Sequence, residues 1–265
     1  MKFREIFRFE FLYQTRRLRT WLYFAVLFAA VFMLVRTAGA GEVHVNSPYS
    51  IAQETILASL LWVFMAPAVA GSAGARDAQT RMQPLMDAVP IGKADYLGGR
   101  FLAAFLINAL IVLAVPLAML AATLAPGMDA QRFGPFRPEV YLTSYGILAL
   151  PTVLIFTSVQ FSFAALKRRA IASYLGTVLF FVTVGAIAAV VTNVLQMTAL
   201  GKLLDPSCRM NVLILMGDTL TPREMNTVPI GLQGSILANR LLWVCAASGL
   251  LTFTYNRFRF GHREG

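Results

Sequence analysis

The chain has 265 residues, of which 57% are hydrophobic and only 14% are charged, and its mean hydropathy is +0.65. Soluble domains carry about 25% charged residues, so this composition excludes an ordinary soluble protein and indicates an integral membrane protein. The net charge of +10 would also suit a nucleic-acid-binding protein, but a basic excess in a multi-span membrane protein normally lies in cytoplasmic loops, so we expect no nucleic acid partner.

Residues 1–19 place six basic side chains among spaced aromatic and aliphatic residues. This pattern is typical of a loosely amphipathic basic helix, although Glu10 interrupts its apolar side. A signal peptide would show a cleavage site of small residues, and none follows here. We therefore predict an interfacial helix over residues 1–19 that lies against membrane lipid and leads into the first span.

Six stretches without a charged residue follow the basic helix, and a span of the bilayer takes about 20 residues. The first and last are slightly short, but arginines at their ends can extend to the membrane surface. The sequence predicts an all-α polytopic integral membrane protein with six transmembrane helices in a single domain over residues 1–265. The stretches are Thr20–Val35, Thr55–Ala75, Phe101–Met128, Val140–Leu166, Ala170–Gly201 and Leu241–Asn256.

Residues 76–100 connect the second and third stretches and mix charges with spaced apolar residues. Four of the apolar residues are spaced as on one face of a helix, which Pro90 should end. A short helix along the membrane surface suits docking of a partner or of lipid headgroups. A solvated connector whose apolar residues touch the bundle is an equally supported interpretation. The four residues are Met82, Leu85, Met86 and Val89.

The segment over residues 202–240 contains several glycines and prolines and shows no clear period. We expect it to be ordered against the bundle, with a broken or re-entrant element over Met225–Asn239. Arg240 is predicted to bond loop carbonyls or Asp205, because an unpaired charge there would be costly. Extension of the Arg240 side chain to lipid headgroups is the equally supported alternative.

The Lys and Arg residues divide unevenly between the two sides of the predicted topology. The N-terminus holds 6 of the 23, the 76–100 loop 4, the turn at residues 167–169 holds 3 and the tail 3, whereas the other side holds 7. Cytoplasmic loops carry the excess of Lys and Arg. We therefore expect both termini and the 76–100 loop in the cytoplasm, and the 202–240 segment outside.

The residue patterns of common enzymes and metal sites are missing from the chain. No phosphate-binding G-x-x-x-x-G-K-[ST] occurs, so ATP and Mg are expected only on a partner. The two histidines, His44 and His262, stand at opposite ends of the chain, which excludes HExxH; we expect no metal and no catalytic residue. Gly71 and Gly74 predict close helix packing. The charge-free stretches suggest that any energy for transport comes from elsewhere.

The chain resembles the type 2 permease subunits of ATP-binding-cassette (ABC) exporters along essentially its whole length. The similarity includes the basic N-terminal helix, the six spans, and a first cytoplasmic loop with Arg76-Asp77, Thr80-Arg81-Met82, Leu85, Pro90-Ile91 and Tyr96-Leu97-Gly98-Gly99-Arg100. Leu204-Asp205-Pro206, Asn226 and Asn239-Arg240-Leu241-Leu242-Trp243 are similar to the branch related to permease–zinc aminopeptidase fusions. The absence of HExxH means that no peptidase activity is expected.

The resemblance implies a function for the chain in the cell (inner or plasma) membrane. Two permease subunits, identical or different, would assemble around a transport path and export a substrate. A separate ATPase subunit would dock on a coupling helix in the first loop, and Asp205, Asn239 and Arg240 would be structural residues of the outer loop. A non-transport membrane scaffold is the alternative; an intramembrane enzyme is the weakest, because no nucleophile and base can be named. The expected coupling residues are Arg76, Asp77, Arg81, Met82, Leu85, Met86 and Pro90.

Overall fold

The computed structural model describes residues 2–37, 41–80, 82, 90–127 and 129–259. Within these ranges the chain forms helices and no strand, which confirms the predicted all-α fold. Six helical segments among them are long and apolar enough to cross a membrane, as the sequence predicted. These segments are Leu18–Thr37, Pro48–Gln79, Lys93–Leu124, Pro138–Lys167, Ile171–Asn193 and Gly234–Arg257.

Three spans are single helices and three are interrupted. The single ones are α2 (Leu18–Thr37), α10 (Ile171–Asn193) and α14 (Gly234–Arg257). The interrupted ones are α3 (Pro48–Val63) with α4 (Pro67–Gln79), α6 (Lys93–Val112) with α7 (Ala114–Leu124), and α8 (Pro138–Ser144) with the π-helical turn η2 (Tyr145–Ala149) and α9 (Leu150–Lys167). Outside the spans lie α1 (Lys2–Thr15), η1 (Ala130–Arg132), α11 (Thr198–Leu204), α12 (Arg209–Thr219) and α13 (Pro222–Thr227).

Prolines explain two of these interruptions. A proline has no N–H to donate, and its ring clashes with the carbonyl four residues earlier. Pro67 lies four residues after Val63, where α3 ends, and Pro116 lies four residues after Val112, where α6 ends. The helices of the second and third spans are therefore each interrupted within their apolar stretch.

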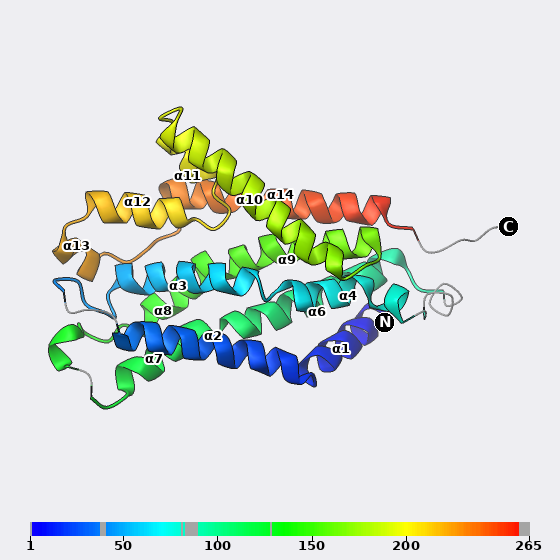
Figure 1. Cartoon of the computed structure of the whole chain (residues 1–265), viewed down its shortest axis with the longest axis horizontal. Helices are drawn as coiled ribbons and strands as arrows, with labels where there is room; N and C mark the ends of the chain where they lie inside the picture. The colour runs from blue at the N-terminus through cyan, green and yellow to red at the C-terminus, as the bar shows by residue number, and fades with distance from the viewer. Residues whose placement is uncertain (1, 38–40, 81, 83–89, 128, 260–265) are drawn as a thin grey trace.

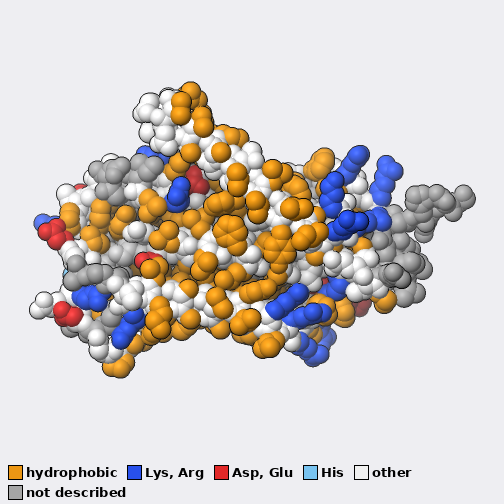
Figure 2. All heavy atoms as spheres, in the orientation of Figure 1, with side chains coloured by type: hydrophobic (Ala, Val, Ile, Leu, Met, Phe, Trp, Pro, Cys, Tyr) orange, Lys and Arg blue, Asp and Glu red, His pale blue; other side chains and the backbone are white. Residues whose placement is uncertain are grey.

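The interrupted spans form the centre of the bundle, and the single helices cover it (Figure 1). In the spans that contain α4, α6 and α9, between 56% and 72% of the residues in an apolar 18-residue stretch are buried, against 17% to 28% in α2, α10 and α14. α10 crosses the other helices obliquely (Figure 1). On the face drawn in Figure 2, hydrophobic side chains cover the middle of the molecule, and most Lys and Arg side chains gather towards its two ends. This distribution is the one expected of helices surrounded by lipid.

Glycines let the central helices approach closely. A Cβ atom at Gly74 of α4 would lie 2.9 Å from the carbonyl oxygen of Phe161 and 3.0 Å from the Cβ atom of Ala164, both in α9. Real Cβ atoms seldom come this close to a neighbouring main chain, so a larger residue would push α4 and α9 apart. A Cβ atom at Gly71 would likewise lie 2.9 Å from the carbonyl oxygen of Ala170, before α10, so the prediction that Gly71 and Gly74 serve helix packing is confirmed.

Several expectations about the span boundaries were wrong. The predicted last stretch began at Leu241, but α14 starts at Gly234, and the predicted fifth stretch reached Gly201, but α10 ends at Asn193. The helices also contain ionisable residues, including Glu54 in α3 and Arg100 in α6. The backbone hydrogen bonds of these helices continue beyond the apolar stretches, and the buried Arg100 side chain finds its partners in Asp77 and the carbonyl oxygen of Ala73.

The 202–240 segment is more helical than its composition indicated. α12 and α13 lie wholly within it, the end of α11 and the start of α14 lie at its two ends, and α12 and α13 pack against α3. The predicted break before the last span is confirmed, since residues 228–233 between α13 and α14 are not helical. The segment is ordered against the bundle, as expected.

Candidate functional site

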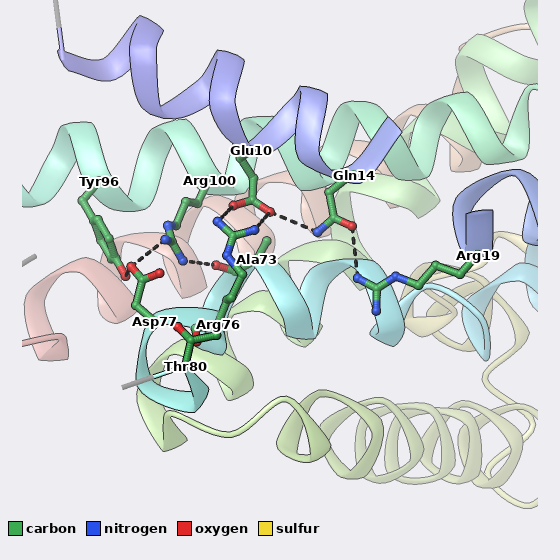
Figure 3. A network of polar contacts seen from close by, with 9 residues as sticks. All are labelled: Glu10, Gln14, Arg19, Ala73, Arg76, Asp77, Thr80, Tyr96 and Arg100. Atoms are coloured by element: carbon green, nitrogen blue, oxygen red, sulfur yellow. Dashed lines mark hydrogen bonds and ion pairs between the residues drawn. The ribbon is translucent and has the colours of Figure 1, made fainter. Parts of the chain in front are cut away.

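Two ion pairs lie buried at the end of the bundle that carries α1, the ends of α4 and α9, and the start of α6; we call this the basic end (Figure 3). In the first pair, Arg76 of α4 donates from Nη1 to Oε1 of Glu10 at 3.1 Å and from Nη2 to Oε2 at 2.5 Å. Glu10, in α1, is fully buried, and Arg76 is 9% exposed. Two parallel charge-assisted bonds fix both the distance and the orientation of the helices that carry them.

Further hydrogen bonds extend from the first pair along α1 towards the first span. Gln14 donates from Nε2 to Oε1 of Glu10 at 3.0 Å, and Arg19 donates from Nη2 to Oε1 of Gln14 at 3.2 Å. Glu10 and Gln14 stand four residues apart and so lie on one face of α1. The Thr20 hydroxyl donates to the main-chain carbonyl of Gln14 at 2.8 Å. The angle between α1 and α2 is therefore set by the same polar chain that holds Arg76.

The second pair joins α4 to α6, the two helices that flank residues 80–92. Arg100 of α6 donates from Nη2 to Oδ2 of Asp77 at 2.5 Å and from Nη1 to the carbonyl oxygen of Ala73 at 3.0 Å. The Tyr96 hydroxyl donates to the same Oδ2 atom at 2.9 Å. Because Arg76 and Asp77 are neighbours on a helix, their side chains point about 100° apart, one towards α1 and the other towards α6.

α1 also holds the far end of the 80–92 connection. The Lys2 ammonium donates to the carbonyl oxygen of Pro90. α1 and α6 pack closely beside this contact, because a Cβ atom at Gly99 would lie 3.1 Å from the carbonyl oxygen of Phe3 and from Cγ2 of Ile6. Both ends of the 80–92 connection are thus tied to α1, at Arg76 and at Pro90.

The predicted coupling residues fall into two groups. Arg76 and Asp77 are buried, and their side chains are paired inside the chain rather than turned to a surface. Met82 is 48% exposed, and its N–H donates to the carbonyl oxygen of Asp77 at 3.0 Å. Three of the four residues of the predicted apolar helical face, Leu85, Met86 and Val89, lie outside the described residues, and so does the coupling residue Arg81.

Glu10 is the functional residue that the sequence interpretation missed. Its interruption of the apolar side of the basic helix was the visible signal, since a charge on the side of a helix that faces protein needs a partner. Tyr96 and Arg100 belonged to the family resemblance but had no role assigned to them. In the structure they close the second ion pair.

A second polar cluster lies at the start of α14, near the opposite end of the bundle. Asn239 is fully buried, and its Nδ2 donates to the carbonyl oxygens of Lys202, Leu203 and Asp205 at 2.8–3.0 Å. These carbonyls belong to the last turn of α11 and the residue after it, where a helix leaves its carbonyls without internal partners. The Asn239 side chain of α14 therefore caps the C-terminal end of α11.

Arg240 continues this cluster from the next position of α14. It donates from Nη1 to the carbonyl oxygen of Pro206 at 3.2 Å and from Nη2 to that of Ser207 at 3.1 Å. Its Nη1 also lies 3.3 Å from the Thr152 hydroxyl of α9. The predicted bonding of Arg240 to loop carbonyls is confirmed.

The Asp205 carboxylate accepts hydrogen bonds from the main chain that follows it. Its Oδ1 accepts from the N–H of Ser207 at 3.0 Å, and its Oδ2 accepts from the N–H of Met210 at 2.8 Å, at the start of α12. A carboxylate at a helix N-terminus satisfies N–H groups that have no internal partner. Cys208, between these residues, is buried, and burial raises the pKa of its thiol above the usual range.

The polar side chains of these two clusters bind other side chains and main-chain groups of the protein. Within the described residues, His, Cys, Asp and Glu nowhere form a group of three that could hold a metal ion. The charges at the basic end are used to join helices to one another.

No protein-family model and no curated protein matches this chain. A function must therefore be inferred from the architecture and from the two clusters.

Proposed function

We propose that the chain is the membrane-spanning permease subunit of an ATP-binding-cassette exporter. In this proposal a separate ATPase subunit binds ATP and Mg and docks on the 80–92 connection, and a second permease subunit completes the transport path. The observation that supports it best is the pair of buried ion pairs that tie both ends of this connection to each other and to α1. The chain itself would bind no nucleotide.

A docking element transmits movement only if it cannot move independently of the spans. Arg76 and Asp77 lie in the last turns of the second span, and Arg100 lies in the second turn of the third. Removing one member of a buried ion pair typically costs about 3–5 kcal/mol, several times the thermal energy. A push on the 80–92 connection would therefore move α4, α6 and α1 together.

The charge distribution and the exposed surface of the spans support the rest of the proposal. The basic end carries the larger share of Lys and Arg, which favours a cytoplasmic position for it and for both termini. α10 and α14 expose large apolar side chains such as Leu179, Val182 and Phe253. These surfaces suit a second permease subunit as well as lipid.

The sharpest test is Leu85→Glu, which places a charge on the predicted docking face. If this face binds an ATPase, an unpaired charge in the contact would cost several kcal/mol, so capture of the ATPase and its ATP turnover should fall. Val228→Glu is the matched control, because it adds the same charge to an exposed apolar residue beyond α13, near the opposite end of the bundle.

The comparison uses ATPase capture from mild detergent and ATP turnover, at matched yield of folded permease. Unchanged capture and turnover with Leu85→Glu would remove the coupling role from this connection. Capture of a partner without any nucleotide-dependent change in the spans would favour the membrane scaffold instead.

A further inference from the structure

A surface hollow of about 420 Å³ lies along α1 and the turn that follows it. Phe9, Leu12 and Tyr13 form its apolar part, and Arg16 and Arg17 form its charged part. None of these lining residues belongs to the 80–92 connection or to the two buried ion pairs. One wall of apolar side chains with two adjacent guanidinium groups at its end has the character of an amphiphile site, since it offers one surface to hydrocarbon and another to an anion.

The two arginines of the hollow are free to bind an anion. Both are exposed, and in the described part of the chain neither guanidinium takes part in a hydrogen bond or an ion pair. Arg17 rests on the ring of Tyr13, with Cζ 4.3 Å from the ring centroid. The third arginine of this turn, Arg19, instead donates to Gln14 in the polar chain that leads to Glu10.

The hollow lies where α1 meets the first span, and a hydrogen bond fixes the turn between the two helices. The Trp21 indole donates from Nε1 back to the carbonyl oxygen of Thr15 at 2.8 Å, while the ring remains 48% exposed. Tryptophan favours the boundary between headgroups and hydrocarbon. Leu18 beside it is 83% exposed and Phe9 is 62% exposed, so apolar and charged surface adjoin at this depth.

We propose that this hollow binds one anionic phospholipid. The lipid phosphate would lie between Arg16 and Arg17, and an acyl chain would lie against Phe9 and Leu12. Guanidinium groups hold phosphate oxygens through paired N–H donors. Glu10, the acidic residue nearest along α1, is already occupied by Arg76 and does not compete for them.

A lipid at this position would adjoin the ion-pair network. Arg76 lies over the ring of Tyr13, with Cζ 4.2 Å from the centroid, so the same ring contacts Arg17 of the hollow and Arg76 of the network. Membrane composition would thereby act on the junction of α1 with α4. This inference is independent of the proposed transport function.

Lipid retention measured by native mass spectrometry tests the proposal. The protein in mild detergent is mixed with phosphatidylglycerol or phosphatidylcholine, and the fraction that carries one lipid is followed against lipid concentration. We expect a preference for phosphatidylglycerol that Arg16→Gln/Arg17→Gln weakens by about tenfold or more, because the phosphate loses its charge-assisted hydrogen bonds from the two guanidinium groups. Arg4→Gln/Arg8→Gln is the matched control, because it removes the same charge from exposed positions of α1 outside the hollow.

Three outcomes would overturn the proposal. Equal weakening by the two double variants would mean that the basic helix attracts anionic lipid without a site. Equal retention of phosphatidylcholine and phosphatidylglycerol by the unaltered protein would mean that the hollow binds lipid through its apolar side chains alone, without recognising an anionic headgroup. Equally tight binding of soluble glycerol phosphate would mean that the hollow holds a free phosphate rather than a lipid.

A measurement on the unaltered protein covers the case in which the variant does not fold. Phosphatidylglycerol with a photoreactive acyl chain should label the stretch that contains Phe9 and Leu12, and excess unlabelled phosphatidylglycerol should suppress this labelling. Labelling only outside α1 would refute the position of the site.

Discussion

The ion pair between Glu10 and Arg76 gives the most direct test of the structure. In Arg76→Leu, the carboxylate of Glu10 stays fully buried and keeps Gln14 as its hydrogen-bond donor among the described side chains. A buried charge that loses its partner costs about 3–5 kcal/mol. We expect the free energy of unfolding to fall by that amount, and α1 to come away from α4.

The reverse substitution should cost less. In Glu10→Leu, the buried Arg76 keeps its contacts with the rings of Tyr13 at 4.2 Å and Phe9 at 5.4 Å. Contacts of this kind contribute about 0.5–2 kcal/mol. The double variant Glu10→Leu/Arg76→Leu should lie within about 1 kcal/mol of the unaltered protein, because apolar replacements of a whole buried pair are often neutral.

The assay is unfolding in mixed micelles with increasing dodecyl sulfate, followed by tryptophan fluorescence. Arg8→Leu is the control, since Arg8 is exposed on α1 and surface substitutions usually stay within about 0.5 kcal/mol. A cost below about 1 kcal/mol for Arg76→Leu, or a double variant no more stable than the weaker single variant, would refute the buried pair.

Three further predictions concern other parts of the chain. Arg240→Gln leaves the carbonyls of Pro206 and Ser207 poorly satisfied and should cost about 2–4 kcal/mol in the same unfolding assay, with reduced yield; wild-type behaviour would show that the Arg240 contacts contribute nothing. Gly99→Ala should cost about 1–3 kcal/mol because its Cβ meets main chain of α1, whereas Gly249→Ala, with open space around it, should be neutral or stabilising; equal effects would contradict the close packing of α1 on α6. Arg223→Cys, at an exposed position of α13, should react with an external thiol reagent in intact cells, while Arg169→Cys stays shielded. In the same assay native Cys208 should react only after unfolding, because it is buried and its raised pKa disfavours the thiolate. Rapid labelling of Cys208 in the folded protein would refute its placement.

The sequence alone determined the membrane class and the number of spans. Apolar stretches of this length need a hydrocarbon environment, and in that environment the backbone must satisfy its own hydrogen bonds as helix. Pro67 and Pro116 lie in the sequence at positions that end α3 and α6 four residues earlier, because the effect of a proline on a helix is local. The topology argument from Lys and Arg needed no contact information and stays a prediction.

The tertiary structure alone decided how the charges inside the bundle are used. Glu10 reads in sequence as a flaw in an amphipathic helix, and its partner Arg76 lies 66 residues away on another helix. Asn239 and Arg240 similarly donate to main-chain carbonyls at the end of α11 and in the turn after it, more than 30 residues earlier in the chain. Periodicity shows which face of a helix a residue occupies, but it carries no information on which side chain stands opposite. A buried charge requires some partner, and only the packing of the helices decides which one it finds.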